Sequence, residues 1–222
     1  MGYQFDFGAL SEYFGLFVEG TAVTLGLTVV ASILGLSLGV GGAAASLSGI
    51  AWLKGLIATY VELIRNSPFI VQMFFVFYGL PGLGFKLSAS EAAILAMTIN
   101  VAAYATEILR AGLEAVPHGQ HDAGRSMGMR PMLIFGLIVL PQAIANVYPA
   151  IVSQVVIVML ESSVVSQIAV VDLTHVGDLI QSRNFRAFET YFVITLIYLG
   201  LAVLMRRLLV FGGRQFLPRP SR

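Results

Sequence analysis

The feature that most constrains the fold is a series of five long apolar runs separated by polar segments. The runs cover about residues 21–47, 53–80, 92–113, 133–161 and 187–210. A transmembrane helix needs about 20 mainly apolar residues, and each run is long enough. The sequence therefore predicts an all-α integral membrane protein with about five transmembrane helices, in a single domain that covers residues 1–222.

Composition narrows the possible functions. Hydrophobic residues make up 57% of the chain and charged residues only 11%, whereas ordinary soluble domains carry about 25% charged residues. The chain has no cysteine, which excludes disulfides and thiolate metal sites. A formal net charge of +1 is too small to indicate nucleic-acid binding. The expected surroundings are membrane lipid.

Basic residues predict the orientation. Nine of the 13 Lys and Arg residues lie on one side of the five-span topology and three on the other, while Arg65 lies within a run. Positive charge accumulates in cytoplasmic loops. We therefore expect the C-terminus and the polar segment from Pro117 to Arg130 to be cytoplasmic, and the N-terminus to be external.

The second run contains charges at a depth where they are costly. Glu62 and Arg65 are three residues apart, so they share a helix face and could neutralise each other. A charge at bilayer depth costs roughly 2.5–3.5 kcal/mol on insertion scales, which favours pairing inside the bundle. We expect both to belong to a gating element with Glu107, with a local break at Pro68. The alternative is that both extend to the cytoplasmic interface.

Two further segments have a predicted structure. Pro141 and Pro149 lie in the fourth run and predict a kinked or broken helix. Residues 162–186, between the fourth and fifth runs, are mixed in polarity and predict a surface helix with loops.

Catalytic and metal-binding patterns are weak. Gly35 to Gly39 matches G-x-S-x-G, but the three histidines lie in polar segments, so small residues for helix packing are the better interpretation. His118, His121 and Asp122 are more typical of an exposed loop than of a metal site. The chain has no G-x-x-x-x-G-K-[ST] motif, so we expect it to bind no ATP by a P-loop. We predict neither an enzyme nor a cofactor on this chain.

The central polar segment carries a specific spacing. Asp122-Ala123-Gly124 is followed by three residues, Gly128, nine residues and the sequence from Ile138 to Pro141. This resembles the EAA loop, E-A-A-x3-G-x9-I-x-L-P, of permease subunits from bacterial ATP-binding-cassette (ABC) importers. Asp122 replaces the usual Glu and Gly124 the second Ala. Gly124 lowers helix propensity by up to about 1 kcal/mol, which predicts a softer helix.

The similarity extends over about residues 21–207 and is strongest to the polar amino acid uptake branch. It rests on these residues: Tyr60 to Arg65, Pro68, Gln72, Tyr78 to Pro81, Ala103, Tyr104, Glu107, Arg110, Pro117, Gly119, Gln120, Leu140 to Ala143, Ser182, Arg183, Phe185, Arg186, Phe188, Glu189 and Tyr191.

The resemblance implies the type I importer permease fold in the bacterial inner membrane. It implies a second permease copy or homologous permease, a pair of cytoplasmic ATPase subunits that hold ATP and Mg, and an external amino-acid-binding protein. A cytoplasmic coupling loop at about residues 114–133 would dock the ATPase through Asp122, Ala123, Gly124 and Gly128.

A substrate site is predicted between the third and fourth runs. Asn100 and Tyr104 share a helix face, and Glu107 continues it. Related permeases carry a polar triplet where this chain has Glu161, Ser162 and Ser163, and those that bind basic amino acids use an acidic residue there. With Gln72 nearby, these residues favour a polar and possibly cationic amino acid. Alternatively, Glu161 receives only the α-amino group, or it is wetted at the interface and binds nothing.

Two other functions remain open at this stage. The chain could be a channel or solute-conducting protein without ATP coupling, or a membrane scaffold. A channel does not need an EAA-spaced loop, and a scaffold does not need Glu and Arg within the membrane.

Overall fold

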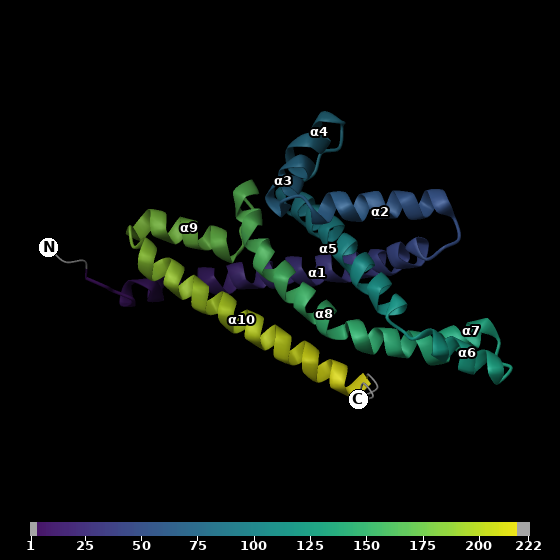
Figure 1. Cartoon of the computed structure of the whole chain (residues 1–222). Helices are drawn as coiled ribbons and strands as arrows, with labels where there is room; N and C mark the ends of the chain where they lie inside the picture. Colours follow the sequence, from purple (N-terminus) through teal and green to yellow (C-terminus); the bar gives the residue numbers. More distant parts are fainter. Residues whose placement is uncertain (1–3, 217–222) are drawn as a thin grey trace. The chain divides into compact units, whose positions relative to one another are not determined.

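The computed structural model describes residues 4–216, and all regular structure in that range is helical (Figure 1). The elements, in chain order, are η1 (Gly8–Tyr13), α1 (Phe14–Ser46), α2 (Ala51–Arg65), α3 (Phe69–Phe74), η2 (Phe75–Gly79), α4 (Leu80–Gly82), α5 (Ala89–Glu114), α6 (His118–Ser126), α7 (Pro131–Ile134), η3 (Phe135–Val139), α8 (Leu140–Glu161), η4 (Ser162–Ile168), α9 (Leu173–Asn184) and α10 (Ala187–Phe216).

Within the described residues, four helices are long and apolar enough to cross a membrane. They cover Gly8–Ser46, Ala89–Glu114, Pro131–Ile168 and Ala187–Gln215. The pair Ala51–Arg65 and Phe69–Gly82 makes a fifth span if it is counted as one. The predicted all-α fold with about five transmembrane helices is confirmed.

Prolines account for the irregular helices. Pro68 has an extended backbone (φ −63°, ψ 136°) and separates α2 from α3, because proline lacks an N–H and disfavours helix in the residue before it. The break predicted at Pro68 is present. The irregularity predicted around Pro141 takes the form of a π-helical turn, η3, in which the N–H of Leu140 bonds to the carbonyl of Phe135. Pro149, in contrast, lies inside α8 without interrupting it.

The described chain divides into two compact units that cut across the sequence order. Unit 1 combines the residues up to Ile33 with Ser67–Thr98 and Val156–Met205. Unit 2 combines Leu34–Asn66, Ile99–Val155 and the residues from Arg206 onward. The single sequence domain stays a prediction.

The core of unit 1 includes α9. Leu173, Val176 and Ile180 on α9 are buried, and they cluster with Phe17 of α1 and Ile194 of α10. A Cβ atom on Gly177 would lie 2.1 Å from Cδ1 of Ile194, so α9 and α10 approach closely at that glycine. The prediction that this segment is a surface helix is therefore wrong for one of its faces, because its apolar residues recur at helical spacing and pack inward.

The core of unit 2 depends on close contact between α1 and α5. A Cβ atom on Gly39 would lie 2.4 Å from Cβ of Ala105, and one on Gly42 would lie 2.2 Å from Oγ1 of Thr106. Only a residue without a side chain allows this approach. The interpretation of Gly39 as a helix-packing residue is confirmed.

Candidate functional site

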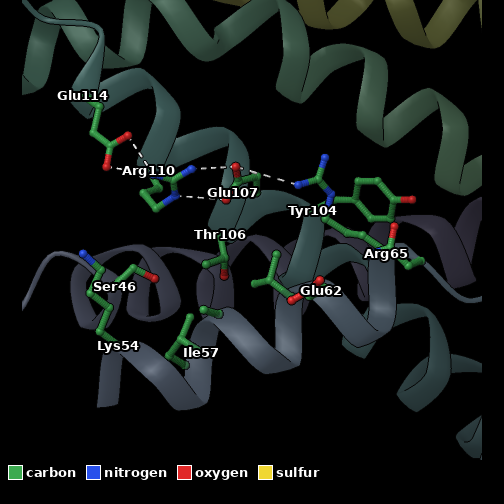
Figure 2. A pocket seen from close by; sticks show the side chains of 13 residues that line it. Ser46, Lys54, Ile57, Glu62, Arg65, Tyr104, Thr106, Glu107, Arg110 and Glu114 are labelled. Atoms are coloured by element: carbon green, nitrogen blue, oxygen red, sulfur yellow. Dashed lines mark hydrogen bonds and ion pairs between the residues drawn. The ribbon is translucent and has the colours of Figure 1, made fainter. Parts of the chain in front are cut away.

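A cavity of ≈ 480 Å³ lies in unit 2 along α2 and α5 (Figure 2). Its lining includes three basic residues and three acidic ones, which is unusual for spanning helices. The residues are Ser46, Lys54, Ile57, Ala58, Val61, Glu62, Arg65, Asn66, Tyr104, Thr106, Glu107, Arg110 and Glu114.

Helical spacing explains why these charges meet. On α2, Lys54, Glu62 and Arg65 are separated by eight and three residues, and on α5, Glu107 and Arg110 are separated by three. Residues at these intervals lie on one face of a helix. Each helix therefore turns a charged stripe toward the cavity.

Arg110 is saturated by carboxylates of its own helix. Its Nε and Nη2 donate to Oε2 and Oε1 of Glu107 at 3.0 and 2.7 Å, and its Nη1 donates to both oxygens of Glu114 at 2.7 and 2.6 Å. These pairs are intrahelical and part-exposed, so each contributes about 0.2–1 kcal/mol. They fix Arg110 and leave its guanidinium little capacity for another acceptor.

Arg65 is held differently. Its Nη1 lies 3.8 Å from Oε1 of Glu107, beyond hydrogen-bond distance, and its side chain is 40% exposed. Its guanidinium carbon lies 5.4 Å from the ring centroid of Tyr104, in cation–π range. Among the described residues, the guanidinium makes no hydrogen bond and Glu62 makes no ion pair. The predicted pairing of Glu62 with Arg65 is therefore wrong, because Glu107 and the Tyr104 ring draw the guanidinium toward α5.

A second contact joins α2 and α5. The hydroxyl of Tyr60 donates to the backbone carbonyl of Ile99 at 2.6 Å. The sequence did not identify Lys54 or Glu114 as cavity residues, or Tyr60 as a contact between the two helices. The spacing of Lys54 from Glu62 and Arg65 was the available signal. Lys54 lies at the start of the second apolar run, however, and was therefore assigned to the preceding loop.

The residues predicted to bind substrate fall into two groups. Asn100 and Tyr104 lie on α5 in unit 2, where Asn100 is only 3% exposed and Tyr104 lines the cavity. Glu161, Ser162 and Ser163 lie in unit 1, where α8 ends and the 3₁₀-helix η4 begins. At this point the helix changes from α to 3₁₀ geometry without a gap.

The side chains of Ser162, Ser163 and Gln72 donate hydrogen bonds to residues three to five positions earlier in the chain. Ser162 and Ser163 donate to the carbonyls of Met159 and Leu160, each at 2.7 Å. Gln72, on α3 in unit 1, donates to the carbonyl and Oγ of Ser67, each at 3.0 Å. The two groups are described separately, and their assignment to one substrate site stays a prediction.

The EAA-like segment forms α6 and a left-handed helix end. Pro117 is the N-cap residue of α6. Gly128 has φ +71°, its N–H donates to the carbonyl of Arg125 at 2.9 Å, and the N–H of Met129 donates to Gly124 at 3.1 Å. These are the two bonds of a Schellman motif. Gly128 therefore ends α6 in a left-handed turn.

Gly124 has a packing role that the sequence did not reveal. A Cβ atom there would lie 2.8 Å from Cγ1 of Ile134 on α7. Gly124 therefore allows α6 to lie close to the start of the next span, where Ile134 clusters with Val116, Val139 and Ala143. Asp122 and Ala123 are exposed.

No group of three His, Cys, Asp or Glu side chains that could hold a metal ion occurs in residues 4–216.

Known proteins are similar to this chain in sequence and in fold. A family described as binding-protein-dependent transport system inner membrane components matches residues 32–212. The arginine transport system permease protein ArtQ of Bacillus subtilis is 31% identical over 90% of this chain and 92% of ArtQ. The nopaline transport system permease protein NocM of Agrobacterium fabrum is 33% identical over 92% of this chain and 89% of NocM.

Solved structures agree. A crystal structure of an amino acid ABC transporter with histidines superposes with a TM-score of 0.90 at 36% identity, and it covers 96% of this chain and 100% of that one. The MetNI methionine ABC transporter, in an inward-facing conformation, has a TM-score of 0.72 at 21% identity, which supports the fold alone. The chain therefore belongs to the family of inner membrane components of binding-protein-dependent transport systems, and it is a multi-pass permease subunit of an ABC importer.

Proposed function

We propose that this permease moves a polar amino acid into the bacterial cytoplasm, driven by ATP hydrolysis on a pair of ATPase subunits. Nearly full-length relatives carry the argument: their names specify arginine, glutamine and nopaline as cargo. These substrates share an α-amino group and a carboxylate. An external binding protein delivers the amino acid, and a second permease copy or a homologous permease completes the pathway.

The proposed orientation has the N-terminus outside and the C-terminus inside. The distribution of Lys and Arg between loops supports it. In this orientation α6 faces the ATPase, which holds ATP and Mg. Its exposed Asp122 and Ala123 and the turn at Gly128 form the docking element, while buried Gly124 fixes α6 against α7.

The proposed substrate site combines Asn100 and Tyr104 of α5 with Gln72, Glu161, Ser162 and Ser163. Asn100 supports this because a buried amide in a spanning helix is costly without a role. The change from α- to 3₁₀-helix after Glu161 supports it because transporters place substrate sites at irregular points of spanning helices. The carboxylate of Glu161 complements a cationic side chain, while Glu62, Arg65 and Glu107 belong to the gate.

The experiment is ATPase stimulation of the assembled permease–ATPase complex by the loaded binding protein, across a panel of amino acids. We expect stimulation by one or a few polar amino acids, with lysine or arginine among them. Stimulation by none of them, together with passive solute flux in the absence of ATP, would instead identify a channel.

A substitution tests the substrate class. Glu161→Gln nearly preserves volume and removes the charge, so we expect loss of lysine or arginine uptake while assembly and basal ATPase activity are retained. The control is Glu19→Gln, which removes the charge of an exposed acid on α1 outside the proposed site. An unchanged substrate ranking in Glu161→Gln removes Glu161 from the site.

A further inference from the structure

Two opposite charges on the cavity wall are left without a full set of partners. Arg65 and Glu62 are three residues apart on α2, and both line the cavity. In Figure 2 Arg65, Glu62 and Tyr104 lie toward one end of the cavity, whereas Ser46, Lys54 and Glu114 lie toward the other. The end with Arg65 thus offers a cation and an anion from one face of α2 that are not paired with each other.

Glu107 cannot satisfy Arg65. Both of its oxygens already accept hydrogen bonds from Arg110, at 3.0 and 2.7 Å, and its nearer approach to Arg65 is 3.8 Å. A guanidinium has five N–H donors in a fixed planar fork. Arg65 is oriented by the Tyr104 ring and the Glu107 charge, and its donors are available to an acceptor within the cavity.

The electrostatic balance of the lining selects the ligand. Three acidic residues accompany three basic ones, so the wall repels a multiply charged anion about as much as it attracts it. A ligand that carries both charges matches better, because a carboxylate takes the fork of an arginine in bidentate geometry and an ammonium pairs with a carboxylate. The volume of ≈ 480 Å³ lies in the range of small-molecule sites.

We propose that this cavity binds the zwitterionic head group of an amino acid, with the α-carboxylate on Arg65 and the α-ammonium on Glu62. This inference rests on the proposed function, in that the amino acid is the transported one. It adds a second station, which includes Tyr104 of the proposed substrate site, on the part of α2 and α5 that the basic residues place toward the cytoplasm. An amino acid leaving the permease occupies it last.

The test uses the absence of cysteine from the chain. Ala58, a small exposed residue of the cavity lining, is changed to Cys. The rate at which a charged thiol reagent modifies this cysteine is measured in the permease–ATPase complex in nanodiscs. The ATPase is cysteine-free, and no binding protein is present. We expect L-arginine and L-glutamine to slow the reaction, and their methyl esters, which lack the carboxylate, to be far weaker. Thr59→Cys, exposed beside Ala58 but outside the lining, is the matched control and should not be protected.

Arg65→Gln in the Ala58→Cys background assigns the carboxylate contact. Protection should then need about 10- to 100-fold more L-arginine, the range for losing a hydrogen bond to a charged group, and the difference between the amino acid and its ester should disappear. Arg65→Lys keeps the charge but loses the planar fork of donors, so the concentration of L-arginine needed for protection should be intermediate. Glu62→Gln should weaken protection by the amino acid and its ester alike, because the ester keeps the α-ammonium.

Three results overturn the proposal. They are absence of protection by either amino acid, equal protection of Thr59→Cys, and an unchanged concentration dependence in Arg65→Gln. The last would show that ligand bound elsewhere alters the cavity. If amino acids stimulate the ATPase but give no protection, the second station fails and the proposed function stands.

Discussion

The charges of the two units are organised in opposite ways. In unit 1, Glu189 is fully buried, and its Oε1 accepts from the backbone N–H of Asp6 and from Nη1 of Arg186, each at 3.1 Å. In unit 2, Arg65 is 40% exposed and approaches its carboxylate only to 3.8 Å. Buried charges persist only when they are well paired, whereas a half-exposed and incompletely bonded charge is able to exchange partners.

Asp172 is the second example in unit 1. It is fully buried, caps α9 by accepting from the N–H of His175 at 2.9 Å, and accepts from the hydroxyl of Tyr198 at 3.2 Å. The N–H of Leu173 donates to Oγ1 of Thr24 at 3.2 Å, so α1, α9 and α10 meet in one network. The comparison indicates that the buried charges of unit 1 hold helices together, while Arg65 in unit 2 is part-exposed and lies beyond hydrogen-bond distance of Glu107.

Removing Glu189 should have the largest effect on stability. Glu189→Ala leaves the guanidinium of Arg186 with the carbonyl of Gln4, at 3.2 Å, and the carboxylate of Asp6, at 3.7 Å, and it deprives the N–H of Asp6 of its acceptor. We expect the free energy of unfolding to fall by about 2–3 kcal/mol, measured as a lower thermal midpoint of the purified protein in detergent. Glu19→Ala, an exposed acid on α1, should change it by less than about 0.5 kcal/mol. Equal midpoints for the two variants would remove the structural role of Glu189.

The stability of unit 2 should depend on the close contact between α1 and α5. Gly39→Ala places a Cβ 2.4 Å from Cβ of Ala105, which has no freedom to move aside, so we expect a loss of about 1–2 kcal/mol. Gly26→Ala on the same helix α1 meets nothing within 4 Å and should be neutral or stabilising by up to about 1 kcal/mol. The thermal midpoints of the two variants should therefore move in opposite directions or diverge clearly. A shared response would show that the close contact of α1 with α5 is unimportant.

Asp172 should give unit 1 a pH dependence. Burial raises the pKa of Asp172 above its ordinary value, and the N–H of His175 offsets this only in part. Between the ordinary pKa of about 3.9 and the raised pKa, the folded protein keeps a proton that the unfolded chain has released. Stability from this residue is therefore present at the acidic end and lost as the pH rises through the raised pKa.

Asp172→Asn cannot ionise and should remove this slope. We expect the thermal midpoint of the wild type, relative to that of Asp172→Asn, to fall as the pH rises from about 4 to 7. Parallel curves for the two proteins would contradict the assignment.

Local chemistry made several features predictable from the sequence. Proline at 68 stops a helix whatever surrounds it, and glycine at 128 takes the left-handed conformation that ends α6. Long apolar runs fix the number of spans. The partner of Arg65 was not predictable, because Glu62 lies on the same helix and Glu107 becomes a neighbour only when α2 and α5 pack.

Other misses reflect ambiguous patterns. The polar side chains of α9 suggested a surface, although Leu173, Val176 and Ile180 repeat at helical spacing and are buried. Gly124 suggested a soft helix, whereas it provides room for Ile134. In both cases the decisive neighbour lies on another helix and comes close only in the folded chain, so sequence spacing alone does not identify it.

The most direct test of ATP-coupled import is uptake and ATP hydrolysis measured in the same proteoliposomes, with wild-type, Gly128→Leu and Gly128→Asn permeases. Gly128 has φ +71° and open space around it, so leucine introduces strain of about 1–2 kcal/mol in the backbone, while asparagine tolerates this conformation. We predict ATP-dependent uptake by the wild type and Gly128→Asn, and loss of uptake and of substrate-stimulated hydrolysis by a correctly inserted Gly128→Leu. Wild-type uptake by Gly128→Leu, or uptake by the wild type without the ATPase, would contradict the account.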